Sequence, residues 1–190
     1  MAAILDGESI RKQVHPISVA FYHEANELSL IDERVELLQG VIFDKMPKSP
    51  LHRAIIRRLL KILGSLDLAG LFVLKEEPIT TADSEPEPDI AIIRGNEDDF
   101  FGAHPTTAEL VIEVAISSIE LDRKKAEIYA EAGVKEYWIV MPKTGSVEVF
   151  TQLEKGRYAA SQVYGDEIEV GSTVLPDIRV RIPELFQPPA

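Results

Sequence analysis

The sequence predicts a single domain of mixed α/β (α+β) class, with a mixed central β-sheet flanked by helices. A long amphipathic helix comes first, three strand-like runs follow it, and a second helix separates those runs from further strands. A helix placed between strands is typical of a crossover connection within one sheet. The chain has 190 residues, which suffices for one domain with a sizeable core.

The N-terminal third contains two helical segments with a less regular stretch between them. Residues 17–30 have helical character, and residues 34–47 are expected to form a helix end or short strand that leads through Gly40 into a strand. After two prolines, residues 51–70 carry apolar side chains at three- and four-residue spacing. This spacing predicts a long amphipathic helix with Leu51, Ile55, Leu59, Ile62 and Leu66 on its buried face.

The rest of the chain alternates strand and helix signals. Apolar runs bounded by Pro, Gly, Asp and Asn predict strands at 71–79, 88–95 and 108–115. Residues 117–134 are expected to be a helix, with Ser117 or Ser118 as its N-cap and Gly133 as its stop. Further strands are predicted at 135–141, 146–152 and 157–164, and the proline-rich tail at 174–190 is expected to lie along the surface.

Composition excludes several kinds of site and partner. The chain has no cysteine, so disulfides, thiolate zinc sites and a cysteine nucleophile are excluded. No apolar run is long enough to span a membrane and the first residues do not resemble a signal peptide, so a cytoplasmic protein without a membrane partner is expected. The net charge of −12 argues against a general nucleic-acid coat protein but leaves room for an enzyme that contacts phosphates locally. The basic cluster at 52–61 is interpreted as the solvated face of the amphipathic helix.

Two acidic residues occupy unusual places in predicted strands. Asp89 lies between Pro88 and the apolar run that opens a strand, although a turn aspartate would also fit there. Glu113 shares a face with Val111 and Ala115 inside a strand expected to be buried. A buried carboxylate requires a paired cation or a metal ion, so Glu113 is either a structural partner or a metal ligand.

The predicted helix after the Glu113 strand adds a lysine on its apolar side. At about 100° per residue, Lys125 falls among the apolar residues while Lys124 falls near the edge of that face. Lys125 can either reach back toward Glu113 or extend its ammonium group to the surface. Two acids and a lysine at one place could hold Mg²⁺ or Mn²⁺ with a water molecule, which favours phosphodiester hydrolysis.

The motifs VELLQGVIFDKMPKSPLHRAI, EPEPDIAII, LVIEVAISS and KAEIYAEAGVKEYWIV, in this order, resemble the PD-(D/E)XK nuclease superfamily. The closest likeness is to its branch of uncharacterised restriction-endonuclease-like proteins. The resemblance implies a restriction-endonuclease-like fold in one domain over 1–190, with the nuclease core at about 18–152 and C-terminal strands and tail at 153–190.

The resemblance also implies roles for individual residues. Asp89 and Glu113 would be the metal ligands, and Glu36, in an N-terminal helix, would be the additional acid; an ordinary helix-surface acid is the alternative. The superfamily lysine usually follows the second acid by two residues, where this chain has Ala115. In this branch the lysine is shifted to the next helix, which agrees with the helical position of Lys125. Two further candidates are Lys124, as a substitute for Lys125, and His52, which could contact phosphate or metal or could be a capping or partly buried histidine.

Three functions are therefore expected in order of preference. The first is a metal-dependent endonuclease that cleaves DNA, with Lys125 assisting the attacking water. The second is an inactive protein of the same fold that serves nucleic-acid processing or mobile elements. The third is a purely structural domain whose acids pair with Arg94 or Lys125. The resemblance further implies a homodimer formed through the strand and aromatic residues at 137–150, and a separate partner could supply target recognition.

Overall fold

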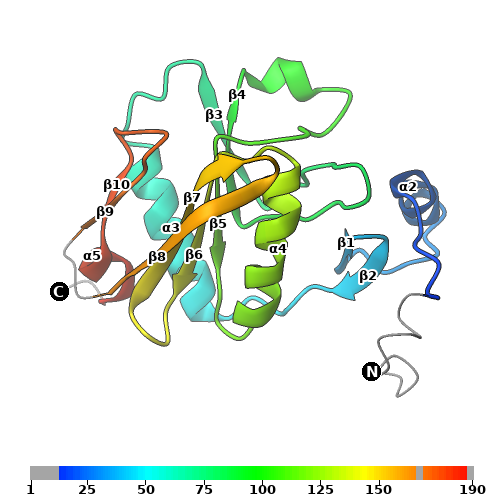
Figure 1. The fold of residues 1–190 in the computed structure, drawn as a ribbon, viewed down its shortest axis with the longest axis horizontal. Helices are drawn as coiled ribbons and strands as arrows, with labels where there is room; N and C mark the ends of the chain where they lie inside the picture. The colour runs from blue at the N-terminus through cyan, green and yellow to red at the C-terminus, as the bar shows by residue number, and fades with distance from the viewer. Residues whose placement is uncertain (1–12, 166–168, 188–190) are drawn as a thin grey trace.

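The computed structural model describes residues 13–165 and 169–187. Its central element is a six-stranded sheet with the strand order β3-β4-β5-β6-β7-β8, accompanied by two small antiparallel hairpins (Figure 1). The elements in chain order are α2 (Val19–Glu27), β1 (Val35–Leu38), β2 (Val41–Asp44), α3 (Pro50–Leu63), β3 (Leu71–Lys75), β4 (Ile90–Arg94), the 3₁₀ helix η2 (Glu97–Phe100), β5 (Leu110–Val114), α4 (Ile119–Glu131), β6 (Glu136–Met141), β7 (Ser146–Glu154), β8 (Arg157–Tyr164), β9 (Glu169–Gly171), β10 (Arg179–Arg181) and α5 (Ile182–Phe186).

The six-stranded sheet is mixed, which confirms the predicted fold class. Strands β5 and β6 are parallel, and the other neighbouring pairs are antiparallel. A parallel pair requires a crossover, and helix α4 provides it between these two strands. The crossover brings α4 against one face of the sheet directly beside β5.

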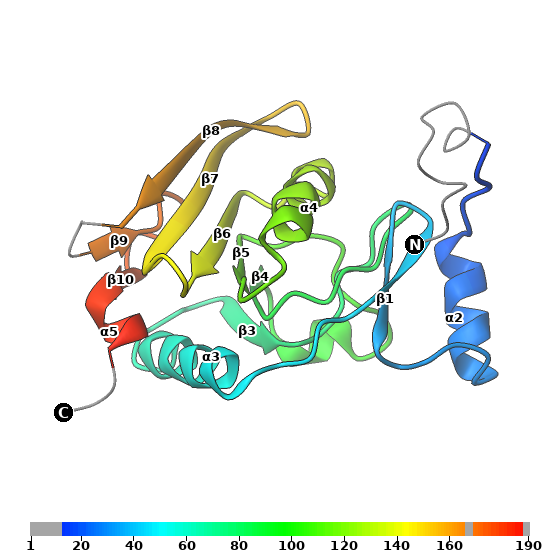
Figure 2. The same cartoon turned by 90° about the horizontal axis from the view of Figure 1, so that it is seen from below.

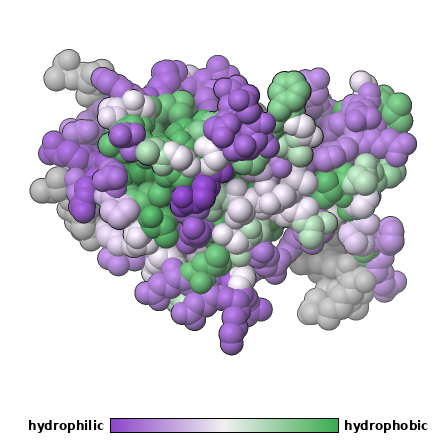
Figure 3. All heavy atoms as spheres, turned by 90° about the horizontal axis from the view of Figure 1, so that it is seen from above, coloured by the Kyte–Doolittle hydropathy of each residue, from purple (hydrophilic) through white to green (hydrophobic). Residues whose placement is uncertain are grey.

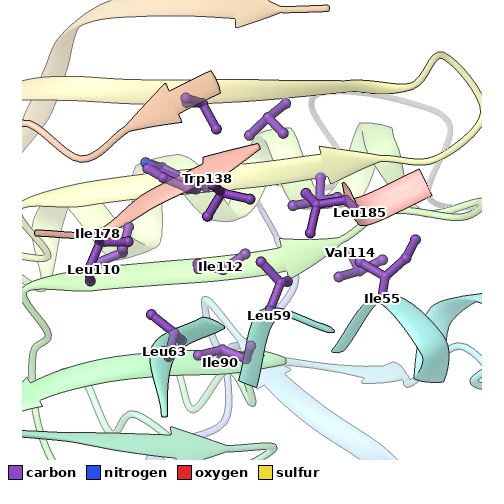
Figure 4. Packing of buried hydrophobic residues seen from close by; sticks show 14 of the residues in the cluster. Ile55, Leu59, Leu63, Ile90, Leu110, Ile112, Val114, Trp138, Ile178 and Leu185 are labelled. Carbon is purple, nitrogen blue, oxygen red and sulfur yellow. The ribbon is translucent and has the colours of Figure 1, made fainter. Parts of the chain in front are cut away.

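Each face of the sheet is covered by a different helix (Figure 2). Residues of even number in β4 and β5, such as Ile90 and Ile112, pack with Ile55 and Leu59 of α3 (Figure 4). Residues of odd number, such as Ala91 and Val111, pack on the other face with Tyr129 of α4. The two-residue period of a strand therefore decides which side chains of β5 face α4.

The N-terminal part forms a small unit beside the sheet. Helix α2 packs on the β1–β2 hairpin through Tyr22, Val35 and Leu37. The hairpin turns at Gly40, whose φ of +71° and close approach to Pro16 leave no room for a side chain. Of the two expectations for residues 34–47, the short strand leading through Gly40 into a second strand is confirmed and the helix end is not, because Glu36 lies in strand β1 and is buried.

Helix α3 is shorter than predicted. It ends at Leu63, and Gly64 serves as its C-cap, so Leu66 lies beyond the helix. Leu51 is exposed in the first turn instead of joining the buried face. Leu66 is nevertheless partly buried against the core, so its apolar side chain contributes to packing beyond the end of the helix.

The C-terminal segment is part of the core, contrary to the prediction that the tail lies along the surface. Ile178, Val180, Ile182 and Leu185 are buried against α3 and the sheet. The buried Glu136 also fastens this segment, because its carboxylate accepts hydrogen bonds from the backbone N–H of Thr173 and from the Trp138 indole. The apolar residues are spaced irregularly between prolines, and this spacing concealed their burial.

Strand β6 and its aromatic residues are not exposed, contrary to the expectation that they could form a dimer surface at 137–150. Strand β6 has β5 and β7 as neighbours, so it has no free edge. Tyr137 and Trp138 are fully buried, one on each face of the sheet. Aromatic residues in this strand therefore serve the core.

The exposed surface is mainly hydrophilic, with some apolar groups between the polar ones. Figure 3 shows one such face, with a green area over the half of the molecule that contains the sheet. Within residues 13–165 and 169–187, no helix is long and apolar enough to cross a membrane.

Candidate active site

Asp89 and Glu113 lie opposite each other at the point where β4 begins and β5 ends. The pairing of Ile90 with Ile112, extended by one residue, brings the two acids face to face. The backbone N–H of Asp89 donates to Glu113 Oε2 at 3.2 Å, and the N–H of Val114 donates to Asp89 Oδ2 at 2.8 Å. Both acids are buried, and these two hydrogen bonds from the backbone hold them in place.

Lys125 of α4 reaches this pair, as the helical spacing predicted. Its Nζ lies 3.2 Å from Glu113 Oε1 and 2.9 Å from Glu36 Oε1, and the side chain is only 7% exposed. Val35 and Leu37 turn toward α2, so the intervening Glu36 turns toward the central sheet. The structure thus brings Glu36, Asp89, Glu113 and Lys125 together from four separate elements or their ends.

His52 lies in the first turn of α3 and contacts Asp89. Its Nε2 is 3.0 Å from Asp89 Oδ2, while its backbone N–H donates to Ser49, which caps the helix. The donor in this contact depends on the tautomer of His52. Nδ1 of His52 is buried without a hydrogen-bond partner among the described residues.

Sequence reasoning missed three residues of this arrangement. The Tyr129 hydroxyl donates to Glu113 Oε1 at 2.9 Å, and its position four residues after Lys125 was the available signal. Asp122 lies one turn before Lys125 on the same face, and its carboxylate accepts a hydrogen bond from Ser118. Lys48 has no periodic signal, since it lies in the irregular segment between β2 and α3.

Lys48 approaches Asp89 from that segment. Its Nζ is 3.1 Å from Glu76 Oε1 and 3.8 Å from Asp89 Oδ1. Lys124, in contrast, is exposed and does not line the pocket described below. Arg94, considered as a structural partner for the acids, instead contacts Glu109.

One pocket between the N-terminal hairpin, α3 and α4 is lined by the predicted residues Glu36, His52, Asp89, Glu113 and Lys125 together with Lys48 and Asp122. Its walls carry more acids than cations. The six acids are Glu36, Asp44, Glu87, Asp89, Glu113 and Asp122, and the three lysines are Lys45, Lys48 and Lys125. A surplus of carboxylates at one place favours the binding of a cation.

Comparison with known families now adds independent information. The family described as "Uma2: Putative restriction endonuclease" matches residues 22–183, which is most of the chain. The chain belongs to the Uma2 family. The match extends through the buried C-terminal segment, beyond the 18–152 core that the motifs suggested.

A solved structure shows the same fold as this Uma2 chain. It is described as a putative nuclease belonging to DUF820 from Anabaena variabilis ATCC 29413. The TM-score is 0.69 at 18% sequence identity, covering 85% of this chain and 96% of the other. No curated protein matches the sequence. Family and fold together indicate a nuclease at the coarse level, and they confirm the resemblance to the restriction-endonuclease-like superfamily.

Burial and mutual repulsion determine the protonation of the pocket. Burial raises the pKa of Glu113 to about 8; Lys125 opposes this shift, while Asp89, Asp122 and Glu36 reinforce it. Burial also raises the pKa of Asp122, against the effects of Lys125 and of the hydrogen bond from Ser118. Several carboxylates surround one ammonium group, so the site binds protons more strongly than separate carboxylates would.

The two neighbours of Glu113 are held in fixed charge states. Burial alone would lower the pKa of Lys125, but Glu113, Glu36 and Asp122 outweigh it and hold that pKa above its usual value. Burial and the charge of Glu113 raise the pKa of Tyr129 well above its usual value. Lys125 is therefore a permanent cation at neutral pH, and Tyr129 is a permanent donor.

The donor set fits a hard divalent cation. Asp89 and Glu113 offer carboxylate oxygens from one pocket wall, and these suit Mg²⁺ or Mn²⁺ better than softer metals. Within the described ranges, no group of three His, Asp or Glu side chains already forms a cluster that could hold a metal ion. Glu113 is at present engaged by Lys125 and Tyr129, so a cation would have to share it with these donors.

Proposed function

We propose that this protein is a metal-dependent endonuclease that hydrolyses phosphodiester bonds of DNA. The observation that supports it most is the opposition of Asp89 and Glu113 across β4 and β5, with the cation Lys125 beside them in one pocket. Membership of a family described as restriction endonucleases supports the reaction class and DNA as the substrate.

Asp89 and Glu113 would hold Mg²⁺ or Mn²⁺ in this pocket. Such an ion, when bound, lowers the pKa of a water molecule and neutralises charge on a phosphate. The backbone bonds from the Asp89 and Val114 N–H groups fix one oxygen of each acid and restrict its rotation. The two carboxylates are thereby preorganised for a shared ligand.

Lys125 is the residue that would orient the attacking water and stabilise developing negative charge. Glu113 and Glu36, whose carboxylates lie 3.2 and 2.9 Å from its ammonium group, raise the pKa of Lys125, so Lys125 acts as a charge and not as a base. Tyr129 and His52 are positioning residues, because the first donates to Glu113 and the second contacts Asp89. Each catalytic acid therefore has one neighbouring side chain that limits its rotamers.

The decisive test is calorimetric titration of Mn²⁺ into the wild type and into Asp89→Asn, with plasmid nicking assayed on the same samples. The proposal predicts that the variant loses both Mn²⁺ binding and nicking. Asp67→Asn is the matched control, because it makes the same Asp-to-Asn change at an exposed residue that does not line the pocket. The control should keep both.

Other outcomes separate the alternatives. Mn²⁺ binding without nicking would point to an inactive accessory protein of the same fold. Absence of Mn²⁺ binding to the wild type would contradict the proposal and leave the Lys125 ion pairs with a structural role.

A further inference from the structure

Helix α3 has a charge distribution opposite to that of the whole chain. The chain contains 32 acidic against 20 basic residues, yet α3 contains four basic residues and no acidic one. Three of the basic residues, Arg53, Arg57 and Lys61, are exposed and follow one another at four-residue spacing. They form one stripe along the solvent side of the helix, with about 6 Å of helix axis between neighbours.

The stripe is not neutralised by nearby acids. In the part of the chain that the structure describes, none of these three side chains forms an ion pair with Asp or Glu. The fourth basic residue of α3, Arg58, is engaged differently, since its guanidinium donates to the Leu185 backbone carbonyl. The three charges of the stripe are therefore available to an external anion.

One end of the stripe opens onto the candidate active site. Arg53 lines a second hollow that adjoins the catalytic pocket. The charged residues common to both hollows are the lysines Lys45 and Lys48 and the acids Asp44 and Glu87. Lys48 belongs to both hollows and lies 3.8 Å from Asp89 Oδ1. The basic residues thus continue from the outer surface of α3 to the carboxylate proposed as a metal ligand. Figure 2 shows α3 on an outer side of the molecule, with the chain segment from β2 running into its N-terminal end.

We propose that Lys48, Arg53, Arg57 and Lys61 form a track that binds the phosphate backbone of duplex DNA and leads it into the catalytic pocket. This inference rests on the proposed function and adds a binding surface to it. A row of cations is required because the pocket itself carries surplus negative charge and would repel a polyanion. Contacts of this kind carry no sequence information, so they position the duplex without selecting a target.

The test measures binding of a short labelled DNA duplex by fluorescence anisotropy, in EDTA to prevent cleavage, over a series of NaCl concentrations. The track variant is Arg53→Gln/Arg57→Gln/Lys61→Gln, which leaves Lys48 and the catalytic pocket intact. The matched control is Lys143→Gln/Lys155→Gln/Arg157→Gln, which removes three exposed positive charges from the turns at the two ends of β7 and from the first residue of β8. Thermal unfolding of each variant verifies that it is folded.

The track variant is expected to bind the duplex at least about tenfold more weakly than the wild type, and the slope of log Kd against log salt should be shallower by about 3. The control should retain both the affinity and the slope of the wild type. Equal losses in the two variants would overturn the track, because binding would then follow net charge alone. The track would also be overturned if the track variant bound the duplex like the wild type. The same conclusion would follow if single-stranded RNA competed for the protein more strongly than duplex DNA.

The outcomes distinguish this inference from the proposed function. If the wild type binds the duplex through the track but neither binds Mn²⁺ nor nicks plasmid, the track is supported and the proposed nuclease activity is contradicted. If the wild type nicks plasmid and the track variant binds the duplex as tightly as the wild type, the track is contradicted and the nuclease proposal stands. A wild type that binds no duplex would overturn the track, and plasmid nicking would then decide the proposed function separately.

Discussion

Asp89 and Glu113 hold each other in place across two neighbouring strands. Glu113 accepts from the backbone N–H of Asp89 at 3.2 Å, and Asp89 accepts from the N–H of Val114 at 2.8 Å. This reciprocal arrangement makes the spacing of the two carboxylates a property of the sheet. The charge environment of these two carboxylates depends on the side chains that surround them.

Replacing Lys125 by Met should lower the free energy of unfolding by about 3 to 5 kcal/mol, because the change leaves buried carboxylates without their cation. Adding Glu36→Gln should recover part of this loss, since it removes one of the unpaired acids. Urea unfolding of the single and double variants measures both effects. Strictly additive losses would show that Glu36 and Lys125 are not coupled.

Tyr129→Phe should cost about 1 to 3 kcal/mol of stability, because it removes the hydrogen bond to Glu113 and keeps the ring in the core. It should also weaken Mn²⁺ binding through loss of the fixed Glu113 rotamer. Tyr137→Phe is the control: it loses a bond to the Asp122 backbone carbonyl and leaves Glu113 untouched. Calorimetry should find weaker Mn²⁺ binding in the first variant only; the same change in both would contradict the positioning role of Tyr129.

Leu185→Ala should destabilise the protein by about 2 to 5 kcal/mol, since Leu185 is fully buried against the core on the α3 side of the sheet. Phe101→Ala removes a larger side chain that is 96% exposed and should change stability by less than about 0.5 kcal/mol. Thermal unfolding of the two variants tests whether the C-terminal segment belongs to the cooperative core. A negligible effect at Leu185 would show that it does not.

Stability should decrease below pH 4.5 in part because of Glu109. Burial would raise the pKa of Glu109, but hydrogen bonds from Lys135 and Arg94 outweigh it and hold that pKa below its usual value of 4.5. The unfolded chain therefore binds the proton first as pH falls, so the contribution is present above pH 4.5 and is lost as pH falls through the folded pKa.

The stability of Glu109→Gln should accordingly depend less on pH in this acidic range. At neutral pH the variant should lose about 1 kcal/mol or less of unfolding free energy, because Lys135 and Arg94 are largely exposed to solvent. Glu120→Gln removes an exposed carboxylate that forms no ion pair among the described residues and serves as the control. Unfolding curves at several pH values make the comparison. Equal pH dependence of Glu109→Gln and the wild type would contradict the assignment.

Local periodicity was sufficient to predict much of this protein. Alternation placed Glu113 on the face shared by Val111 and Ala115, and helical spacing placed Lys125 on the side of α4 that faces the sheet. Both inferences depend only on the direction in which side chains leave a regular backbone, which neighbouring residues determine. The same reasoning gave the mixed sheet and the crossover helix.

Other features depend on contacts between distant segments and required the tertiary structure. The residues around Glu36 fitted either a helix end or a short strand, and pairing with β2 makes the segment a strand and turns its carboxylate toward Lys125. Leu185 and the residues near it carry no regular period, so only packing against α3 revealed that they are buried. Lys48 is close to the stripe on α3 in the sequence, but only the path of the chain before α3 brings it beside Asp89. The sequence by itself determined which face of each element is apolar; the tertiary structure decided which faces meet, because that choice depends on pairing and packing between residues far apart in the chain.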